Sequence, residues 1–386
     1  MERLDYSQQI TKAYRTHPVV ALLGPRQCGK TTLAKQYIKQ HKELGEIHYF
    51  DLEDPTDLAK LDNPMLAFSS LEGLIVIDEI QRRPELFPVL RVLVDEKKAK
   101  RFLILGSASR ELIQQSSETL AGRIAYIELM PFSFPETHDL EKLWIRGGFP
   151  LSYLGKTLED SIEWRKFYIQ TFLEQDIPAL GIQIPPQALR RFWMMLAHYH
   201  GNIFNASEIG RSLGIADTTV RRYLDILTYT FMVRQLQPWF ENINKRQVKS
   251  PKIYFRDSGI FHSLIDATDP KLLHRHPKLG ASWEGLVVEE IIRKHHAEPG
   301  ECYFWGVHSQ AELDLLIFKN GKRLGFEIKY ADAPKLSKSM ITAYETLHLD
   351  ELKVIYPGKK DYKLSENIEV CGAEHFLRKS DTGEHA

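Results

Sequence analysis

Residues 19–31 read Val-Val-Ala-Leu-Leu-Gly-Pro-Arg-Gln-Cys-Gly-Lys-Thr, a short apolar run followed by a glycine-containing loop. The run predicts a buried strand, and apolar residues at helical spacing follow Lys30. Glycines at positions 24 and 29 allow backbone N–H groups to turn inward onto phosphates. In such a loop the lysine reaches the β- and γ-phosphates of a nucleotide, and the Thr31 hydroxyl ligates Mg²⁺. The stretch therefore predicts a phosphate-binding loop. The alternative is a glycine turn between packed elements.

A second apolar run, Leu74-Ile75-Val76-Ile77, is typical of a strand buried on both faces of a parallel sheet, and it ends in Asp78-Glu79. An Asp in this position holds Mg²⁺, and the second acid can orient and deprotonate an attacking water. We therefore expect an ATPase that uses ATP and Mg²⁺, although strands also end in acids for no functional reason. The residues expected to bind the nucleotide and its metal are Gly24, Pro25, Arg26, Gln27, Cys28, Gly29, Lys30, Thr31, Thr32 and Asp78.

Two further features follow these motifs along the chain. A third predicted strand ends in Ser107, and Gly122-Arg123 precedes a fourth. Together with the two motifs above, they resemble the AAA-type ATPases of bacteria and archaea that carry a C-terminal domain of unknown function, type 4143. The resemblance implies a catalytic set of Lys30, Glu79, Ser107 as a sensor, and Arg123 as an arginine finger. A finger completes a neighbouring subunit's site, so we expect a homo-oligomer, whereas an ion-paired surface arginine is the alternative.

Composition limits the other classes of function. The 386 residues are 43% hydrophobic and 26% charged, which is ordinary for a folded globular protein. Lys plus Arg equals Asp plus Glu at 51 each, so any DNA contact must be a local patch. The chain has no apolar run long enough to span a membrane and no apolar signal after its charged start, so we expect a cytoplasmic protein without membrane contact. Cysteines at 28, 302 and 371 have neither disulfide nor zinc-finger spacing.

Residues 205–229 predict a helix–turn–helix. Asn205 and Glu208 form a capping-box pair, Gly214 makes the turn, and Asp217 caps a second helix. Residue types suited to phosphates and base edges follow on that helix and on a loop between two predicted wing strands, 233–237 and 252–255. They predict DNA as a partner through Thr218, Thr219, Arg221, Arg222, Lys245 and Arg246, with Lys249 nearby. Alternatively, such a module binds protein or acts as a lid.

The segment from Ser250 to Gly259 is similar to the most recognisable motif of the C-terminal family domain. Its residues alone indicate no chemistry. A strand followed by an Asp-Ser-Gly turn explains it equally well.

Residues 312–329 predict a hairpin that brings charged residues together. Asn320-Gly321 is a preferred two-residue type I′ turn, and it places Lys319 opposite Lys322. The same register pairs Asp314 with Glu327 and Glu312 with Lys329. The opposite face is then apolar and predicted to be buried, with Leu313, Leu315, Ile317, Leu324, Phe326 and Ile328. Two carboxylates about 5 Å apart at Cβ repel each other unless they are protonated or bridged by a cation.

An upstream helix, 282–294, places Glu284 on its apolar side, where an acid needs a partner. A helix Glu, a strand Asp and a Glu-x-Lys pair resemble the restriction-endonuclease-like fold, here Glu284, Asp314, Glu327 and Lys329. The resemblance implies metal ligands at Asp314 and Glu327 and metal-dependent phosphodiester cleavage. Charges paired by chance on an exposed face are one alternative. An inactive nuclease fold used for binding is another, and the pattern does not separate it from an active one.

The predicted fold class is therefore α/β in three parts. A P-loop NTPase parallel sheet with helices on both faces occupies residues 1–155, a helical and winged-helix domain 156–270, and a small nuclease-like α/β domain 271–386. The glycines and the proline in residues 146–150 interrupt regular secondary structure and suggest the first boundary. The expected function is ATP hydrolysis coupled to binding, remodelling or cleavage of DNA. The alternative is an ATP-switched regulatory or interaction protein with an inactive nuclease fold and no DNA substrate.

Overall fold

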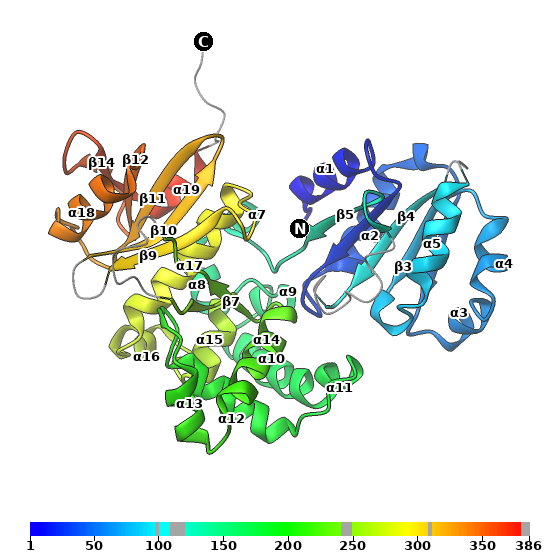
Figure 1. Cartoon of the computed structure of the whole chain (residues 1–386), viewed down its shortest axis with the longest axis horizontal. Helices are drawn as coiled ribbons and strands as arrows, with labels where there is room; N and C mark the ends of the chain where they lie inside the picture. Colours follow the sequence, from blue (N-terminus) through cyan, green and yellow to red (C-terminus); the bar gives the residue numbers. More distant parts are fainter. Residues whose placement is uncertain (97–99, 109–119, 241–248, 308–310, 380–386) are drawn as a thin grey trace, which may run out of the picture. The chain divides into compact units, whose positions relative to one another are not determined.

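The computed structural model describes residues 1–96, 100–108, 120–240, 249–307 and 311–379 (Figure 1). The chain forms two compact units, each made of several segments. The first contains Met1–Phe132, Thr171–Ile184 and Ile226–Met232; the second contains Ser133–Gln170, Pro185–Asp225 and Val233–Ala386. Among the described residues, no helix combines the length and the apolar character that crossing a membrane requires.

The first unit is built on a parallel sheet of five strands in the order β2-β3-β4-β1-β5. Its strands are β1 (Val19–Leu23), β2 (Ile47–Asp51), β3 (Gly73–Asp78), β4 (Lys100–Gly106) and β5 (Ile124–Glu128). Buried apolar runs predicted all of them except the edge strand β2, whose residues are mostly half-buried. Because β4 lies between β1 and β3, the loops that follow these three strands meet at one edge of the sheet.

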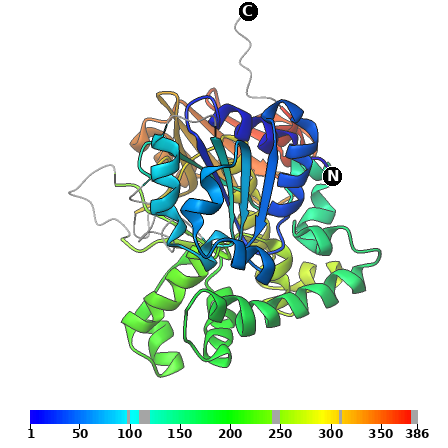
Figure 2. The same ribbon diagram turned by 90° about the vertical axis from the view of Figure 1, so that its right-hand side faces the viewer.

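Helices cover both faces of this sheet, as predicted (Figure 2). Alternate strand residues point to opposite faces: Val20 and Leu22 pack with α1 and α2, whereas Ala21 and Leu23 share a core with α4 and α5. The helical elements of this unit are α1 (Leu4–Ala13), α2 (Lys30–Gln40), η1 (Lys42–Leu44), α3 (Pro55–Lys60), α4 (Pro64–Ser69), η2 (Ile80–Arg82), α5 (Leu86–Asp95), the π-helical η4 (Phe172–Asp176) and α11 (Ile177–Ala179).

The second unit begins with helices and a small sheet in the order β6-β8-β7. Its strands are β6 (Asn202–Ile203), β7 (Val233–Leu236) and β8 (Lys252–Phe255). The helices in this part of the chain are α7 (Phe134–Thr137), α8 (Leu140–Arg146), α9 (Pro150–Tyr153), α10 (Leu158–Thr171), α12 (Pro186–Ala197), α13 (Ala206–Leu213), α14 (Asp217–Tyr229), α15 (Ser258–Leu264) and α16 (Pro270–Arg275). The Asn205 side chain accepts the N–H of Glu208 at 3.2 Å, and Gly214 ends α13 with a φ of 70°, as the helix–turn–helix pattern predicts.

The Asp-Ser-Gly motif has a structural explanation. One carboxylate oxygen of Asp257 caps α15 by accepting the N–H of Ile260, and the other accepts the N–H of Gly148, both at 2.8 Å. A Cβ on Gly259 would lie 2.3 Å from the carbonyl oxygen of Arg146. The motif therefore fastens the loop after α8 to the start of α15, which is the turn interpretation of the sequence.

The C-terminal part of the second unit is a mixed sheet in the order β13-β14-β12-β11-β10-β9. Its strands are β9 (Cys302–Val307), β10 (Ala311–Lys319), β11 (Lys322–Ile328), β12 (Glu351–Tyr356), β13 (Tyr362–Lys363) and β14 (Ile368–Gly372). Helix α18 (Lys338–Leu347) shares one apolar core with the sheet, while α17 (Leu279–Lys294) and α19 (Ala373–Arg378) also pack against its strands. Asn320 and Gly321 both have positive φ, and Lys319 pairs with Lys322, which confirms the predicted hairpin turn.

The predicted strand alternation is wrong at one point of β10. The pairing with β9 shifts register between Leu313 and Leu316, and these two leucines share the core that includes α18. A bulge inserts an extra residue, so Leu313 does not share a face with Leu315. Pairing with β11 begins only at Leu315, and the carboxylate of Asp314 accepts the backbone N–H of Ile328 at 2.9 Å.

Candidate active site

Glycines and positive φ angles shape the loop after β1. A Cβ on Gly24 would lie 1.9 Å from the carbonyl oxygen of Leu129, so only glycine fits there. Gln27 and Gly29 have φ values of 60° and 100°, which bend the loop toward the start of α2. The ammonium of Lys30 donates to the carbonyl oxygens of Gly24 and Pro25, each at 2.9 Å. The lysine is thus folded over the loop that the sequence assigns to phosphate.

The two residues predicted to hold Mg²⁺ lie together. The Thr31 hydroxyl donates to Asp78 Oδ2 at 2.8 Å, and the Tyr49 hydroxyl donates to the same oxygen at 2.6 Å. Burial raises the pKa of Asp78, although both hydrogen bonds oppose the rise. A carboxylate beside hydroxyl oxygens is a donor set that fits a hard cation such as Mg²⁺. Sequence reasoning missed Tyr49 because it lies on the unpredicted strand β2.

A polar network holds Glu79 at the sheet edge. Glu79 follows β3 in the left-handed region, with a φ of 58°. The Ser107 hydroxyl donates to Glu79 Oε2 at 3.2 Å, and the Gln81 amide donates to the Ser107 hydroxyl at 2.8 Å and to Glu79. The Gln81 carbonyl oxygen accepts the N–H of Ser107 at 3.2 Å. Gln81 was not predicted, yet it binds both the predicted base and the predicted sensor.

Arg26 of the loop is neutralised by two acids. Its Nη1 lies 2.7 Å from Asp176 Oδ1, and its Nη2 pairs with Glu53. Asp176 belongs to η4, a segment far from the loop in sequence but part of the same compact unit. No local pattern reveals such a partner. Phosphate oxygens at the loop would compete with these two carboxylates for the guanidinium.

The remaining loop residues differ in exposure. Cys28 is fully buried, its thiol donates to the carbonyl oxygen of Leu129 at 3.2 Å, and burial raises its pKa. Pro25 is buried as well, whereas Thr32 is exposed on α2. Cys28 therefore serves packing.

Arg123 forms an exposed ion pair. Its guanidinium donates to both carboxylate oxygens of Asp95, at 2.7 and 3.1 Å. Its side chain is 37% exposed, so the pair contributes little to stability. The finger role remains a prediction, and it requires this pair to open.

The predicted DNA-contact residues lie on the accessible side of α14. Thr218, Arg221 and Arg222 are exposed, and Thr219 is half-buried. Within the described parts of the chain, neither arginine has an ion pair. Lys245 and Arg246 lie outside the described residues, while Lys249 is exposed.

A lysine lies within the nuclease-like carboxylate group. The ammonium of Lys252, on β8, lies 3.3 Å from Asp314 Oδ1 and 3.6 Å from Glu284 Oε1, and it pairs with Glu312. Lys252 is only 3% exposed. Burial lowers its pKa, but Tyr254 and the surrounding acids outweigh this and raise the pKa above the ordinary value. We call Lys252 with Glu284, Glu312 and Asp314 the Lys252 cluster; sequence reasoning missed the lysine.

Glu327 and Lys329 adjoin the Lys252 cluster as a pair, with Lys329 Nζ 2.6 Å from Glu327 Oε1. The other Glu327 oxygen is buried, and no described residue hydrogen-bonds to it. Burial and the charge of Asp314 raise the pKa of Glu327 to about 8 and that of Glu284 to about 7. Such acids need a proton or a cation.

The predicted divalent-metal site does not fit this arrangement. The resemblance to nucleases implies metal ligands at Asp314 and Glu327, but the ammonium of Lys252 already lies 3.3 Å from Asp314. Among the described residues, the one group of three whose ligand atoms all lie within 4.8 Å of one another is Asp361, Glu369 and Cys371, not the nuclease-like set. We therefore derive no cleavage step from these carboxylates.

The chain resembles known proteins along nearly all of its length. An AAA domain model matches residues 16–138, a domain of unknown function (DUF8612) matches 137–271, and a domain of unknown function (DUF4143) matches 279–376. Among solved structures, the Walker-type ATPase PABY2304 of Pyrococcus abyssi is 16% identical, covering 68% of this chain and 95% of its own with a TM-score of 0.47. DnaA of Aquifex aeolicus bound to AMPPCP is 11% identical, covering 58% and 86%, with a TM-score of 0.27.

Two relatives are much more similar. The uncharacterized proteins Rv2008c of Mycobacterium tuberculosis and Mb2031c of Mycobacterium bovis are each 48% identical over 380 residues, which is 98% of this chain and 85% of theirs. This chain therefore belongs to the family that joins an AAA-type P-loop domain to a C-terminal DUF4143 domain. It is a P-loop ATPase, with the AAA domain at residues 16–138.

Proposed function

We propose that the protein is a Mg²⁺-dependent ATPase whose turnover responds to DNA. The proposal rests on the arrangement of side chains at the edge of the sheet. There Thr31 is hydrogen-bonded to Asp78, and the next residue, Glu79, is hydrogen-bonded to Ser107. Bound at Thr31 and Asp78, Mg²⁺ would neutralise charge on the phosphates. Glu79 orients and deprotonates the attacking water, and the Ser107 hydroxyl contacts the water or the γ-phosphate.

Lys30 and Arg26 change partners in this proposal. The ammonium of Lys30 exchanges two neutral carbonyl oxygens for phosphate oxygens, which are stronger acceptors because they are charged. The Arg26 guanidinium exchanges part of its pairing with Asp176 and Glu53 for phosphate oxygens of the bound nucleotide. Arg123 acts on a neighbouring subunit in a homo-oligomer, after leaving Asp95.

The DNA contact is assigned to α14 and the strand pair β7–β8. The chain here forms a helix, a strand, two helices and a two-stranded hairpin, in the order α12, β6, α13, α14, β7, β8. This is the arrangement of a winged helix. In helix–turn–helix proteins the second helix of the motif enters the major groove. Arg221 and Arg222 are the exposed cations of that helix, so they supply the local positive charge that the neutral chain lacks overall.

The domain assignment at residues 1–155, 156–270 and 271–386 is part of the same proposal, with the last domain a nuclease-like fold that does not cut DNA. The ammonium of Lys252 already supplies one positive charge among the carboxylates, against Glu284 and Asp314. Without a divalent cation, such a site has no means of activating water for phosphodiester cleavage. The domain then serves binding.

A second candidate function is an ATP-switched interaction protein without a DNA substrate. It is favoured by the Lys252 cluster, because an inactive nuclease fold needs no nucleic acid. In that case ATP turnover is indifferent to DNA, and the exposed face of α14 contacts protein.

Phosphate release by the full chain, with and without duplex or single-stranded DNA, separates the two functions. The double variant Arg221→Ala/Arg222→Ala is compared with Arg190→Ala/Arg191→Ala, which removes two exposed arginines from α12 instead. We expect DNA to accelerate the wild type and the α12 variant, and salt to weaken their binding. Equal rates with and without DNA would exclude the DNA function.

A further inference from the structure

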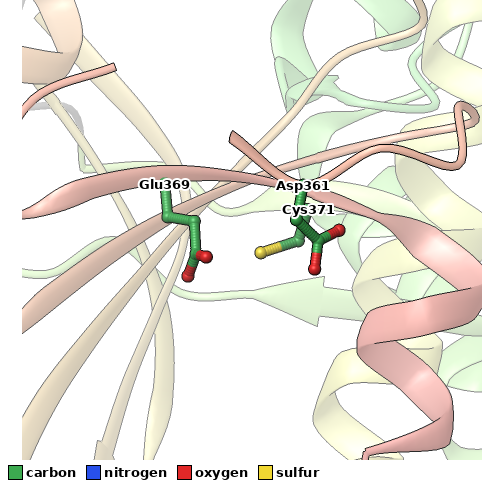
Figure 3. A group of neighbouring side chains, drawn as sticks. All are labelled: Asp361, Glu369 and Cys371. Carbon is green, nitrogen blue, oxygen red and sulfur yellow. The ribbon is translucent and has the colours of Figure 1, made fainter. Parts of the chain in front are cut away.

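Strands β13 and β14 bring together three ligand-type side chains that the sequence separates. Tyr362 pairs with Val370, so Asp361 lies opposite Cys371, and Glu369 shares a face with Cys371 two residues later. The ligand atoms of Asp361, Glu369 and Cys371 all lie within 4.8 Å of one another (Figure 3). Cysteine spacing alone does not reveal this group, because its other members are carboxylates.

Two of these side chains are without a partner among the described residues. Cys371 is 3% exposed, and its sulfur points toward Glu369 (Figure 3). Within the part of the chain that the structure describes, neither the Cys371 thiol nor the Glu369 carboxylate has a hydrogen bond or an ion pair. Lys353, next to Glu369 on the neighbouring strand, pairs instead with Glu351 at 2.7 Å. Two ligand-type groups are thus left available, one of them deeply buried.

The third side chain, Asp361, is held firmly. One carboxylate oxygen accepts the N–H of Gly372 at 3.0 Å, and the other lies 2.5 Å from His375 Nδ1 and 3.7 Å from Lys379 Nζ. Each carboxylate oxygen has two lone pairs, so Asp361 can keep these hydrogen bonds and still bind an ion. Metal-ligating carboxylates are commonly oriented by such partners.

We propose that Asp361, Glu369 and Cys371 bind a Zn²⁺ ion, with His375 positioning Asp361. A thiolate combined with carboxylates suits zinc, whereas Mg²⁺ and Ca²⁺ prefer oxygen alone. Bond lengths of about 2.3 Å to sulfur and 2.0–2.2 Å to oxygen require only small movements of the three side chains. The fourth coordination position is left to water. The thiol proton leaves to solvent on binding, and the ion ties β13 to β14 at the edge of the sheet.

The test is metal binding by the full chain. Protein stripped with a chelator is titrated with Zn²⁺ against a chromophoric chelator, and Co²⁺ is used as a spectroscopic probe because thiolate ligation gives a sulfur-to-cobalt charge-transfer band. The variants are Cys371→Ser and Glu369→Gln. Cys302→Ser is the matched control, since Cys302 is also a buried strand cysteine but lies outside the group.

We expect the wild type and Cys302→Ser to bind zinc alike and to show the cobalt band. Cys371→Ser should lose the band and bind zinc about tenfold or more weakly, and Glu369→Gln should weaken binding while keeping the band. The Glu369 change lies at a half-buried position, so it tests the site even if Cys371→Ser fails to fold. A wild type that takes up no zinc, or a band that persists in Cys371→Ser, would overturn the assignment.

Discussion

The site after β1 and the Lys252 cluster both bring acidic side chains together at a sheet, but the groups that contact the carboxylates differ. At the first site Asp78 faces the hydroxyls of Thr31 and Tyr49, which leaves the carboxylate charge for a cation that arrives with the nucleotide. At the second, the buried ammonium of Lys252 lies against Asp314 and Glu284. An acidic motif therefore predicts a metal site only when no cation of the chain already lies among the acids.

The largest effect is expected at the first site, from Lys30→Ala. The ammonium would be the main cation of the chain on the β- and γ-phosphates, so its loss should remove measurable ATP binding and turnover. Lys39→Ala, at an exposed position of the same helix, is the control and should keep both. Fluorescent-nucleotide binding together with phosphate release measures the effect. Near-normal binding by Lys30→Ala would contradict the assigned phosphate contact.

Glu79→Gln should separate binding from chemistry at the same site. Glutamine preserves the shape but cannot take a proton, so kcat should fall about 100-fold or more while nucleotide affinity stays unchanged. Steady-state turnover and equilibrium binding are compared on one preparation. Normal turnover would remove Glu79 from its role as base.

Lys252→Met tests the opposite property of the second site. Removing one partner of a buried ion pair leaves uncompensated charge and costs about 3 kcal/mol of folding free energy. Lys249→Met, at an exposed position just before β8, should cost nothing measurable. Urea unfolding monitors both variants. Equal stability of the two would show that the carboxylates do not depend on Lys252.

The smallest effect is a pH dependence from Glu327. Because its pKa is raised from 4.5 to about 8, the folded state holds a proton that the unfolded state has lost. The stabilising contribution is fully present below 4.5 and is lost as the pH rises through about 8. In Glu327→Gln, the free energy of unfolding should fall less than in the wild type between these limits. Parallel pH profiles of the two proteins would argue against the raised pKa.

The difference between the two sites also explains how far sequence reasoning reached. The phosphate loop and Asp78-Glu79 are local motifs flanked by buried strands, so the pattern predicted the fold. The structure places Thr31 beside Asp78 and Ser107 beside Glu79. Sequence reasoning missed Gln81 and Tyr49 because a glutamine in a turn and a tyrosine on a half-buried edge strand have no distinctive sequence pattern. Only the order of the strands in the sheet brings these two side chains next to the predicted site residues.

Sequence reasoning missed the long-range partners for a different reason. Lys252 and Asp176 contact residues distant in sequence, and hydrophobic periodicity carries no information about such pairs. The bulge in β10 is similar, because one extra residue shifts the strand faces without changing the composition. The hairpin turn at Asn320-Gly321 was predictable because its backbone geometry is encoded in two residues.

One reaction tests the contrast between the two sites directly. The full chain is incubated with ATP, Mg²⁺ and supercoiled plasmid, and phosphate release and plasmid integrity are followed in the same tube. We predict that the plasmid accelerates phosphate release and remains supercoiled, since the first site is assigned to ATP hydrolysis and the ammonium of Lys252 already lies among the carboxylates of the second. Plasmid nicking that disappears in Asp314→Ala would contradict the account, as would phosphate release that ignores the plasmid.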